Sequence, residues 1–411
     1  MLSIQRKLFT LIVLGAVGIG FVGGIGFSRH QDSNSINNVV KQLINQDVGK
    51  PDTVDFSLFW QAWNRLHDRY VDKSKLDTQK LLYGAIQGMV NAVGDPYTVF
   101  FEPSTSKKFQ EEISGAFSGV GMEIGKKDNL LTVIAPIKDS PAFKAGIKTG
   151  DRILKVDDHA TADLSIEEAV NLIRGPKGTR VTLTISPQGT TDTKNIELVR
   201  ENIKIPAVDW KLIGNDVAVI EIYSFNQNVD SEFKKAAQEI QKSTATKIIV
   251  DLRNNPGGLL DSAVNLAGWF LDNGNVVVIE DFGNGKQNDY KTSGDASLKK
   301  YQTVILINGG SASASEILAG ALHDNREIKL IGEKSFGKGS VQQLENFSDN
   351  SSLKVTIAKW LTPKGISISE KGIQPDIKVE INPKDIESGI VLIGEPGKDP
   401  QLDKAVEELR K

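Results

Sequence analysis

The chain has 411 residues, 25% of them charged, and a formal net charge of −3 at pH 7. This length predicts two or three domains, and a weakly acidic balance without a long basic run argues against a nucleic-acid partner. The lack of cysteine excludes disulfides, thiolate nucleophiles and zinc–thiolate sites. The four histidines are scattered along the chain, so we expect neither a metal ion nor a cofactor.

An apolar segment near the N-terminus is long enough to span a membrane. Arg6 and Lys7 precede the 20 uncharged residues 8–27, and about 20 apolar residues suffice for a transmembrane helix. Apolar regions of signal peptides are shorter, about 7–15 residues, and end in a small-x-small cleavage site. We therefore expect residues 1–28 to form an uncleaved single-pass anchor in the cell membrane, with the bulk of the chain extracytoplasmic. A cleaved signal peptide is the alternative.

Folded structure is expected to begin after a linker. Residues 29–53 are polar and lack sustained periodicity. In the segment 54–113, apolar residues recur at helical spacing between Phe56 and Val93, which predicts two amphipathic helices. The sequence Gly94-Asp95-Pro96 should end the second helix.

Residues 114–200 consist of short β-rich runs separated by glycine turns, with one helix predicted at 165–173. The predicted strands are Leu130–Ile134, Arg152–Val156, Arg180–Ile185 and Asn195–Val199. The run Gly119-Val120-Gly121-Met122, followed by Ser140-Pro-Ala, Ala145-Gly-Ile and Gly150-Asp151 in that order, resembles a PDZ domain.

PDZ domains bind an extended peptide as an added strand and hold its terminal carboxylate with backbone amides. The resemblance implies this role for Ser118, Gly119, Val120 and Gly121. Taken alone, these glycines would indicate only a tight hairpin.

Residues 201–382 alternate between strands and helices, which predicts an α/β fold. The predicted strands are Val217–Ile222, Lys247–Asp251, Val276–Glu280, Thr303–Ile307, Lys329–Ile331 and Leu353–Ala358. The predicted helices are Ser231–Ser243, Leu260–Leu271 and Ala314–His323. In the tail, residues 383–411, we expect a helix over Leu402–Lys411 that could pack on a partner chain, as in a homodimer.

Ser313 is a candidate nucleophile because it lies between a predicted strand and a predicted helix. The amides and the dipole of a first helical turn favour the oxyanion that forms when a carbonyl is attacked. The sequence Ser313-Ala-Ser-Glu316 is also a capping box, in which the hydroxyl would serve only the helix end.

A base for this serine must come from elsewhere in the chain. His323 lies ten residues further along the same helix, roughly 15 Å away at 1.5 Å per residue, and cannot reach Ser313. Lys338, between Gly337 and Gly339, could act as the base if burial lowers its pKa, or it could be an exposed turn lysine. Gln342 could orient the amine if a helical turn or bend brings the two together.

A second glycine turn, Asp251-Leu-Arg-Asn-Asn-Pro-Gly257-Gly258, follows a predicted strand and precedes a helix. Its amides could donate to the oxyanion, or the glycines could serve the geometry of the turn alone.

Taken together, these motifs resemble the C-terminal processing (tail-specific) peptidases over roughly residues 56–379. The motifs are Gly94-Asp-Pro-Tyr-Thr98, Asp251 to Gly258, Gly310-Ser-Ala-Ser-Ala-Ser-Glu-Ile317, Phe336-Gly-Lys-Gly-x-Val-Gln342 and Thr362-Pro-x-Gly365 through Gly372-Ile-x-Pro-Asp376.

The resemblance implies a crotonase-like α/β core with an inserted PDZ domain that gates it. It also implies roles for individual residues: Ser313 as nucleophile, Lys338 as base, Gln342 as its orienter, and amides of Gly257 or Gly258 and of Ala314 as the oxyanion hole. Arg174 would couple peptide binding in the PDZ domain to the active site, although a solvated turn arginine is the alternative. The expected function is a membrane-anchored serine endopeptidase acting on proteins with accessible C-termini.

Three other functions are alternative interpretations of the same residues, and the sequence supports them less. Gly332 to Lys338 has the glycine and lysine spacing of a nucleotide-binding loop, but Gly339 stands where such a loop needs Ser or Thr. A non-catalytic PDZ scaffold would need no nucleophile at all. Acyl-CoA chemistry is used by other proteins with the implied core fold, and a fold alone does not define a function.

Overall fold

The computed structural model describes residues 54–411 except 128–129, 138, 188–189, 191 and 370. It consists of two compact units, one ending at Thr78 and the other running from Gln79 to Lys411. No helix in the described part of the chain is long and apolar enough to cross a membrane. The expected membrane segment, residues 8–27, and the expected linker lie outside the described residues.

The first unit contains helix α3 (Ser57–Arg69) and the short 3-10 helix η1 (Lys73–Lys75). None of the residues of α3 is buried, and its aromatic side chains contact one another rather than a core. Leu58 and Trp60 are 74% and 51% exposed. Helix α4 (Thr78–Asn91) lies in the second unit except for its first residue, and together with α3 it confirms the prediction of two helices.

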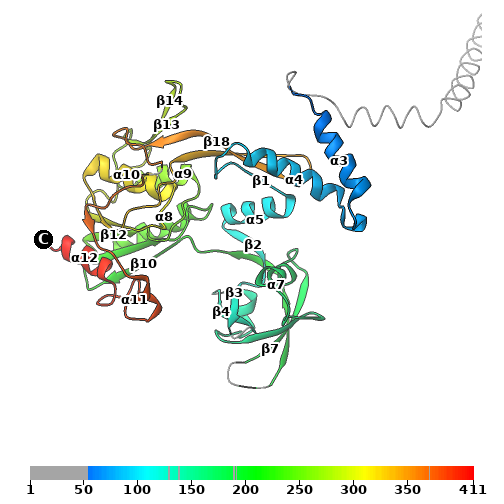
Figure 1. Ribbon diagram of the computed structural model, residues 1–411. Coiled ribbons are helices and arrows are strands. Elements are labelled where there is room, and N and C mark those ends of the chain that lie inside the picture. The colour runs from blue at the N-terminus through cyan, green and yellow to red at the C-terminus, as the bar shows by residue number, and fades with distance from the viewer. Residues whose placement is uncertain (1–53, 128–129, 138, 188–189, 191, 370) are drawn as a thin grey trace, which may run out of the picture. The chain divides into compact units, whose positions relative to one another are not determined.

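An antiparallel sheet forms the segment that resembles a PDZ domain (Figure 1). The sheet has the order β3-β4-β5-β7-β8, and its strands are β3 (Met122–Lys127), β4 (Leu130–Pro136), β5 (Arg152–Val156), β7 (Arg180–Ser186) and β8 (Lys194–Val199). Helix α7 (Ile166–Ile173) starts at a capping box between Ser165 and Glu168. The short elements are α6 (Pro141–Lys144) and β6 (His159–Ala160), which pairs with β5.

At the two ends of this segment, β2 (Ala116–Gly119) pairs with β9 (Glu201–Lys204) in an antiparallel ribbon. Helix α5 (Pro103–Ser114), which the sequence analysis did not predict, ends at Gly115 immediately before β2.

The largest core surrounds a six-stranded sheet with the order β10-β11-β12-β15-β16-β19. Its strands are β10 (Val208–Ile213), β11 (Val217–Ile222), β12 (Lys247–Asp251), β15 (Gln302–Ile307), β16 (Lys329–Gly332) and β19 (Ile377–Lys378). Only β10 and β11 pair in antiparallel fashion, and the remaining pairs are parallel. The parallel strands linked by helices confirm the predicted α/β fold.

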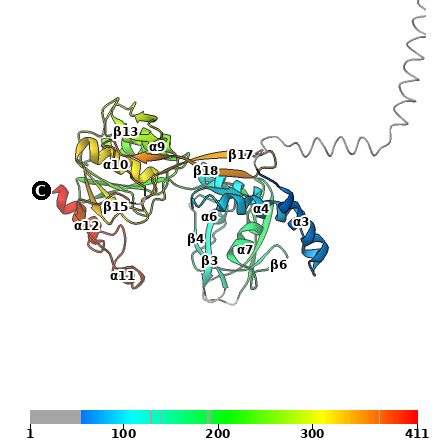
Figure 2. The same ribbon diagram turned by 45° about the horizontal axis from the view of Figure 1, so that its top comes forward.

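Both faces of the central strands of this sheet are buried, which explains the nearly continuous apolar runs in β11, β12 and β15. Ile248 and Val250 belong to the core beneath helices α8 (Val229–Lys242), α9 (Leu260–Ala267) and α10 (Ala314–Arg326), whereas Ile249 faces the opposite core. On that opposite face, Leu402 and Leu409 of helix α12 (Pro400–Leu409) cover the strands (Figure 2).

The expected packing of the tail helix on a partner chain is therefore wrong for this face. Helix α12 packs against β12, β15 and β16 of its own chain because its apolar stripe completes the core of the sheet. The tail also contains a short helix, α11 (Pro383–Glu387).

After β16 the chain enters a second sheet, part of which extends away from the parallel strands (Figure 2). It has the order β1-β18-β13-β14, with β17 also paired to β18. The strands are β1 (Val99–Phe101), β13 (Val276–Asp281), β14 (Gln287–Lys291), β17 (Ser340–Asn346) and β18 (Ser352–Leu361). Strand β17 was not predicted from the sequence.

Candidate active site

The candidate residues meet because several parallel strands end at one edge of the central sheet. Asp251 at the end of β12 lies in register with Leu306 of β15, and Ile307 lies in register with Gly332 of β16. The carboxyl ends of adjacent parallel strands share an edge, so the loops that follow them come together. These loops carry Gly257 and Gly258, Ser313, and Lys338, respectively.

Ser313 stands before α10 in a backbone conformation that an ordinary helix cap does not use. Its φ is 54° and its ψ is −116°, whereas N-cap residues normally adopt extended angles with negative φ. A non-glycine residue with positive φ is uncommon and strained, and a sharp strand-to-helix turn of this kind exposes a nucleophilic serine in other hydrolases. The conformation therefore favours a nucleophile over a simple cap at this position.

Glu316 connects the serine loop to the lysine loop. One oxygen of this buried carboxylate, Oε2, accepts hydrogen bonds from the backbone N–H of both Ser313 and Lys338, at 2.9 Å each. The other, Oε1, accepts from the Gly337 N–H at 2.7 Å and from the Ser335 hydroxyl at 2.5 Å. Burial raises the pKa of Glu316, while these hydrogen bonds act in the opposite direction.

The amine of Lys338 is half-buried and faces the ring of Tyr97, with Nζ 5.7 Å from the ring centroid. Burial lowers the pKa of Lys338, and the negative charge of Glu316 partly opposes this effect. Among the described residues the amine has no ion-pair or hydrogen-bond partner. A lysine in this environment is suited to act as a neutral base.

Gln342 does not make the contact that was expected. It lies in strand β17, and its amide nitrogen donates to the carbonyl oxygen and hydroxyl of Ser340, at 2.9 and 2.6 Å. A helical turn or a bend was expected to be needed for contact with Lys338, and the structure has no helical turn here. The pairing of β17 with β18 is instead irregular between Val341 and Gln342. This irregularity lets Gln342 line the same cavity as Lys338 without a hydrogen bond to it.

The backbone N–H groups that could form the oxyanion hole differ in whether they already donate a hydrogen bond. The N–H of Gly257 donates to Oδ1 of Asn255 at 2.9 Å. In the described part of the chain, no hydrogen bond uses the N–H of Gly258 or of Ala314 as its donor. The free pair is therefore Gly258 and Ala314.

Gly257 still has a packing role beside the serine. A Cβ added there would lie 2.8 Å from the Cβ of Ser313 and 2.9 Å from the nitrogen of Ala314, so this close approach requires glycine. Asn255 supports the same loop, because its carbonyl oxygen accepts from the Ala312 N–H at 3.0 Å and from the Ser315 hydroxyl at 2.9 Å.

Several of these groups line one cavity of about 490 Å³. Its lining includes Ser313, Lys338, Gln342, Gly257 and Gly258, together with apolar side chains. The apolar lining residues include Phe109, Leu260, Tyr290, Ile317, Leu344 and Trp360. No histidine lines the cavity, and the described residues contain no group of acidic or histidine side chains able to hold a metal ion.

His323 lines a different cavity, beside Asp324 and Thr362. Its Nδ1 is 3.1 Å from the carbonyl oxygen of Ile328 and 3.6 Å from a carboxylate oxygen of Asp376. The structure therefore agrees with the sequence argument that this histidine does not serve Ser313.

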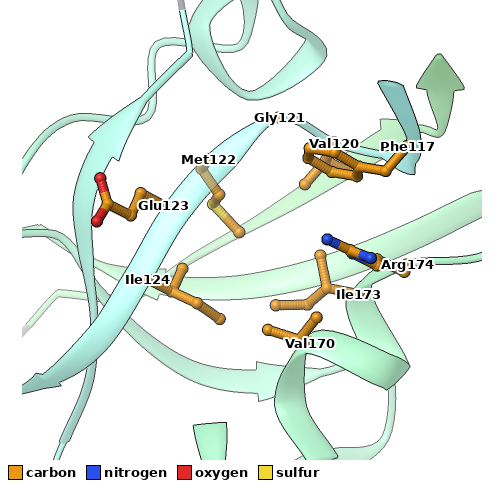
Figure 3. A pocket seen from close by; sticks show the side chains of 9 residues that line it. All are labelled: Phe117, Val120, Gly121, Met122, Glu123, Ile124, Val170, Ile173 and Arg174. Carbon is orange, nitrogen blue, oxygen red and sulfur yellow. The ribbon is translucent and has the colours of Figure 1, made fainter. Parts of the chain in front are cut away.

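A separate groove of about 200 Å³ lies between β3 and α7 (Figure 3). Met122 and Ile124 on β3 face Val170 and Ile173 on α7, which makes the groove largely apolar. The sequence analysis missed these four residues, although the alternation along β3 is a signal that could have identified the two on that strand.

Of the residues expected to bind a peptide terminus, Val120 and Gly121 line this groove. Ser118 and Gly119 do not; they belong to β2, where they pair with Asn202 and Glu201 of β9.

Arg174 lines the end of the groove and is fixed by two contacts. Its Nη1 is 2.8 Å from a carboxylate oxygen of Glu111, and its guanidinium lies 4.4 Å from the centroid of the Phe117 ring. Glu111 belongs to α5, and the neighbouring residue Glu112 lines the cavity of Ser313. Arg174 thus connects the groove to a helix that borders the cavity of Ser313.

The loop from Gly332 to Lys338 lacks the structure of a nucleotide-binding loop. It continues into strand β17, whereas a phosphate loop opens a helix whose N-terminal amides bind the phosphates. Gly339 is needed for packing, because a Cβ there would lie 2.2 Å from the nitrogen of Ser369.

Comparison with known proteins identifies three matching family models. Residues 216–379 match peptidase family S41, and residues 132–186 match a PDZ domain. Residues 12–105 match the N-terminal domain of the activating protease CtpB.

Two curated relatives cover most of the chain. The carboxy-terminal processing protease CtpA of Bacillus subtilis (strain 168) is 38% identical over 321 residues, or 78% of this chain and 68% of that protein. A protein named as a CtpA-like serine protease in Staphylococcus epidermidis (strain ATCC 35984) is 42% identical over 320 residues, or 77% of this chain. The chain spans only 64% of the length of this second relative.

Among solved structures, one described as an S41 protease from Bacteroides fragilis NCTC 9343 has a similar fold. The two share a TM-score of 0.53 with 15% sequence identity, over 88% of this chain and 98% of the other. At this level of identity the likeness concerns the fold alone.

Proposed function

Because this chain belongs to the S41 family of C-terminal processing serine peptidases, we propose that Ser313 is its nucleophile and Lys338 its general base. The observation that carries this proposal is the shared acceptor: Oε2 of Glu316 binds the backbone N–H of both residues. The strained conformation of Ser313 and the lowered pKa of Lys338 support the same pairing. Gln342 would orient the amine once substrate enters the cavity that they share.

The proposed reaction proceeds through an acyl-enzyme. The neutral amine of Lys338 takes the hydroxyl proton of Ser313, whose oxygen then attacks the peptide carbonyl carbon. The oxyanion of the tetrahedral intermediate would accept hydrogen bonds from the free N–H groups of Gly258 and Ala314. The protonated lysine gives its proton to the leaving amine. The same lysine then takes a proton from a water molecule, which hydrolyses the ester and releases Ser313.

Substrate proteins would be captured by their C-terminal tails. The groove between β3 and α7 is apolar, which suits apolar side chains at the end of an extended peptide. The ion pair of Arg174 with Glu111 links the groove directly to α5. We assign Arg174 the role of coupling tail binding to the catalytic cavity, in line with the resemblance described above.

Three further features belong to this proposal. The apolar segment 8–27 would anchor the protein in the cell membrane and leave the peptidase extracytoplasmic. The exposed apolar side chains of α3, such as Leu58 and Trp60, would pack on a second copy in a homodimer. The parallel strands with the serine at the start of α10 support a crotonase-like core.

The decisive test is tail-dependent proteolysis. A folded reporter protein with an apolar C-terminal peptide is incubated with the wild type and with Ser313→Ala, and the products are identified by mass. We expect cleavage only by the wild type, and weaker cleavage when the reporter ends in a polar peptide. Equal cleavage by Ser313→Ala would refute the assignment of the nucleophile.

A non-catalytic scaffold is the alternative function, and covalent labelling separates it from a peptidase. A serine-reactive phosphonate probe should label the wild type but not Ser313→Ala. Labelling of both proteins to the same extent would mean that Ser313 is not an activated nucleophile.

A further inference from the structure

The cavity of Ser313 contains a second lysine, Lys354, that the proposed reaction does not use. Lys354 lies on β18 opposite Leu344 of β17, two residues before Thr356, which pairs with Gln342. Alternate residues of a strand share a face, and directly paired residues of neighbouring strands share it too. The strand pairing therefore explains why Lys354, Leu344 and Gln342 all line the same cavity.

Two aromatic rings hold the amine of Lys354 in position. Its Nζ lies 5.2 Å from the ring centroid of Phe101 and 5.3 Å from that of Phe109. The two rings also contact each other, with centroids 5.1 Å apart. A cation beside aromatic faces is attracted by their electron density, so the ammonium is fixed without being neutralised.

No carboxylate among the described residues forms an ion pair with Lys354. The acidic groups whose charge acts on the pKa of Lys354 are Asp95 and Glu112, and Asp95 already accepts hydrogen bonds from the Thr98 hydroxyl at 2.6 Å and from the Tyr97 N–H at 3.1 Å. Glu112 lines the cavity but is exposed to solvent. The positive charge of Lys354 therefore remains available to a group that enters the cavity.

The surroundings make an unpaired cation unfavourable there. Burial lowers the pKa of Lys354, and the positive charge of Lys338 lowers it further, whereas Asp95 and Glu112 act in the opposite direction. Across the cavity, Lys338 in turn lies near the carboxylate of Glu316. A carboxylate brought by the substrate would compensate the desolvation of Lys354.

We propose that Lys354 is a specificity-determining residue that binds the side-chain carboxylate of an Asp or Glu of the substrate close to the scissile bond. This inference rests on the proposed peptidase function, because it concerns the same cavity. The ammonium and the carboxylate form a charge-assisted hydrogen bond in a partly dry site, and the surrounding aromatic rings exclude water from it. The PDZ groove would bind the end of the tail, and Lys354 would bind the segment that contains the scissile bond.

The test compares peptide substrates that differ in a single group. Glu is scanned through the positions around the cleavage site of a peptide with an apolar C-terminus, and each Glu peptide is matched by its Gln isostere. We expect one position at which the wild type prefers Glu by roughly tenfold in kcat/KM, the scale of one hydrogen bond to a charged group. Lys354→Met should abolish this preference, and Lys354→Glu should reverse it.

Lys359→Met is the matched control, because Lys359 lies exposed on the same strand and does not line the cavity. It should keep the Glu preference of the wild type, and Lys354→Arg should keep part of it. The same Glu and Gln peptides with amidated C-termini show whether Lys354 binds the side-chain carboxylate or the terminal carboxylate of the peptide. If Lys354 binds the side chain, the Glu-to-Gln ratio stays the same after amidation.

Two results would overturn the proposal. The first is a Glu-to-Gln ratio that is the same in the wild type and in Lys354→Met at every position. The second is an equal loss of kcat/KM for the Glu and Gln peptides in Lys354→Met, together with a shift of the acid limb in the pH profile of kcat/KM. This result would mean that Lys354 acts on the pKa of Lys338 instead. In both cases, cleavage of the Gln peptide by the wild type but not by Ser313→Ala would leave the peptidase function intact.

Discussion

The backbone N–H groups of Ser313 and Lys338 donate to the same oxygen atom, Oε2 of Glu316, each over 2.9 Å. The two residues are 25 positions apart in the sequence and follow different strands of the central sheet. A buried carboxylate that accepts from both loops fixes the backbone of the proposed nucleophile relative to that of the proposed base. Both side chains line the same cavity, and a direct hydrogen bond from the Phe336 N–H to the carbonyl oxygen of Ser311, at 3.0 Å, also joins the two loops.

Glu316→Gln should lower kcat strongly while leaving most of the fold intact. The amide keeps one acceptor oxygen but turns an NH₂ group toward backbone N–H donors. In either orientation a hydrogen bond to the Lys338 loop is lost, and an NH₂ group in the place of Oε2 also loses the hydrogen bond to Ser313. Misplacing reacting groups by about 1 Å can cost about 100-fold in rate, and we expect a loss of this order with little change in KM. Steady-state kinetics and a circular-dichroism melt measure the two effects. Unchanged kcat in a folded variant would show that the shared acceptor does not position the loops.

The pH dependence of the activity should follow the amine of Lys338. Burial lowers the pKa of Lys338, and only the neutral amine can accept the proton of Ser313. We therefore expect kcat/KM to rise with pH through that lowered pKa and to level off above it. A rate that stays constant into acid would contradict a lysine base.

The same lowered pKa predicts a stability effect. Between the folded-state pKa and the ordinary pKa of lysine, the unfolded chain binds more protons, so the stability of the wild type should increase with pH. Lys338→Met removes the buried amine and should be inactive but more stable. Its advantage in melting temperature should be largest below the folded-state pKa and should shrink as the pH rises. Lys359→Met, an exposed substitution, should show no such trend.

Asn255→Ala should reduce both stability and activity. The buried amide of Asn255 donates to the carbonyl oxygen of Ile222 at 2.7 Å and accepts from the Gly257 N–H at 2.9 Å. Leaving such buried partners unsatisfied costs about 1–3 kcal/mol each, and a mobile Gly257 would displace the N–H of Gly258 from the oxyanion. We expect a lower urea midpoint. We also expect kcat to fall about 10- to 100-fold, because one oxyanion donor is disturbed without being removed. Asn284→Ala, in an exposed turn, is the control and should change neither.

Asp399→Ala tests whether the tail helix supports the oxyanion loop. Arg253 lies between Asp251 and Asp399, with nitrogen–oxygen distances of 2.6 and 2.9 Å, and all three side chains are buried. Asp399 also caps α12 by accepting from the N–H groups of Gln401 and Leu402 at 3.1 Å. Removing one partner of a buried ion pair costs about 3–5 kcal/mol, which should lower the melting temperature markedly.

Activity should fall as well in Asp399→Ala, even well below its melting temperature, because Arg253 precedes the turn that carries Gly258. Glu407→Ala, on the exposed side of α12, should leave both quantities near the wild-type values. A destabilised Asp399→Ala with normal kcat would mean that the helix stabilises the fold without supporting the site.

The sequence determined many of the regular elements and the candidate reactive residues. Strands β5, β11 and β12 begin and end where they were predicted, because continuous apolar runs and the glycine turns beside them are local features. Ser313 and Lys338 were found through short motifs, which also record local requirements such as the close approach at Gly339. The Gly94-to-Thr98 motif likewise contained Tyr97, although only the structure brings its ring to Lys338.

The tertiary structure decided how these groups are combined, since contacts between distant residues leave no periodic pattern in a sequence. Strand β17 is partly polar and was missed, so the contact of Gln342 with Lys338 was expected to depend on a helical turn or a bend. Glu316 looked like half of a capping box, but folding added the loop of Lys338 to its partners. The tail helix was expected on a partner chain because nothing local reveals that the central sheet has a second face to cover. Lys354 carried no signal at all, since its significance comes only from the side chains that surround it in the folded cavity.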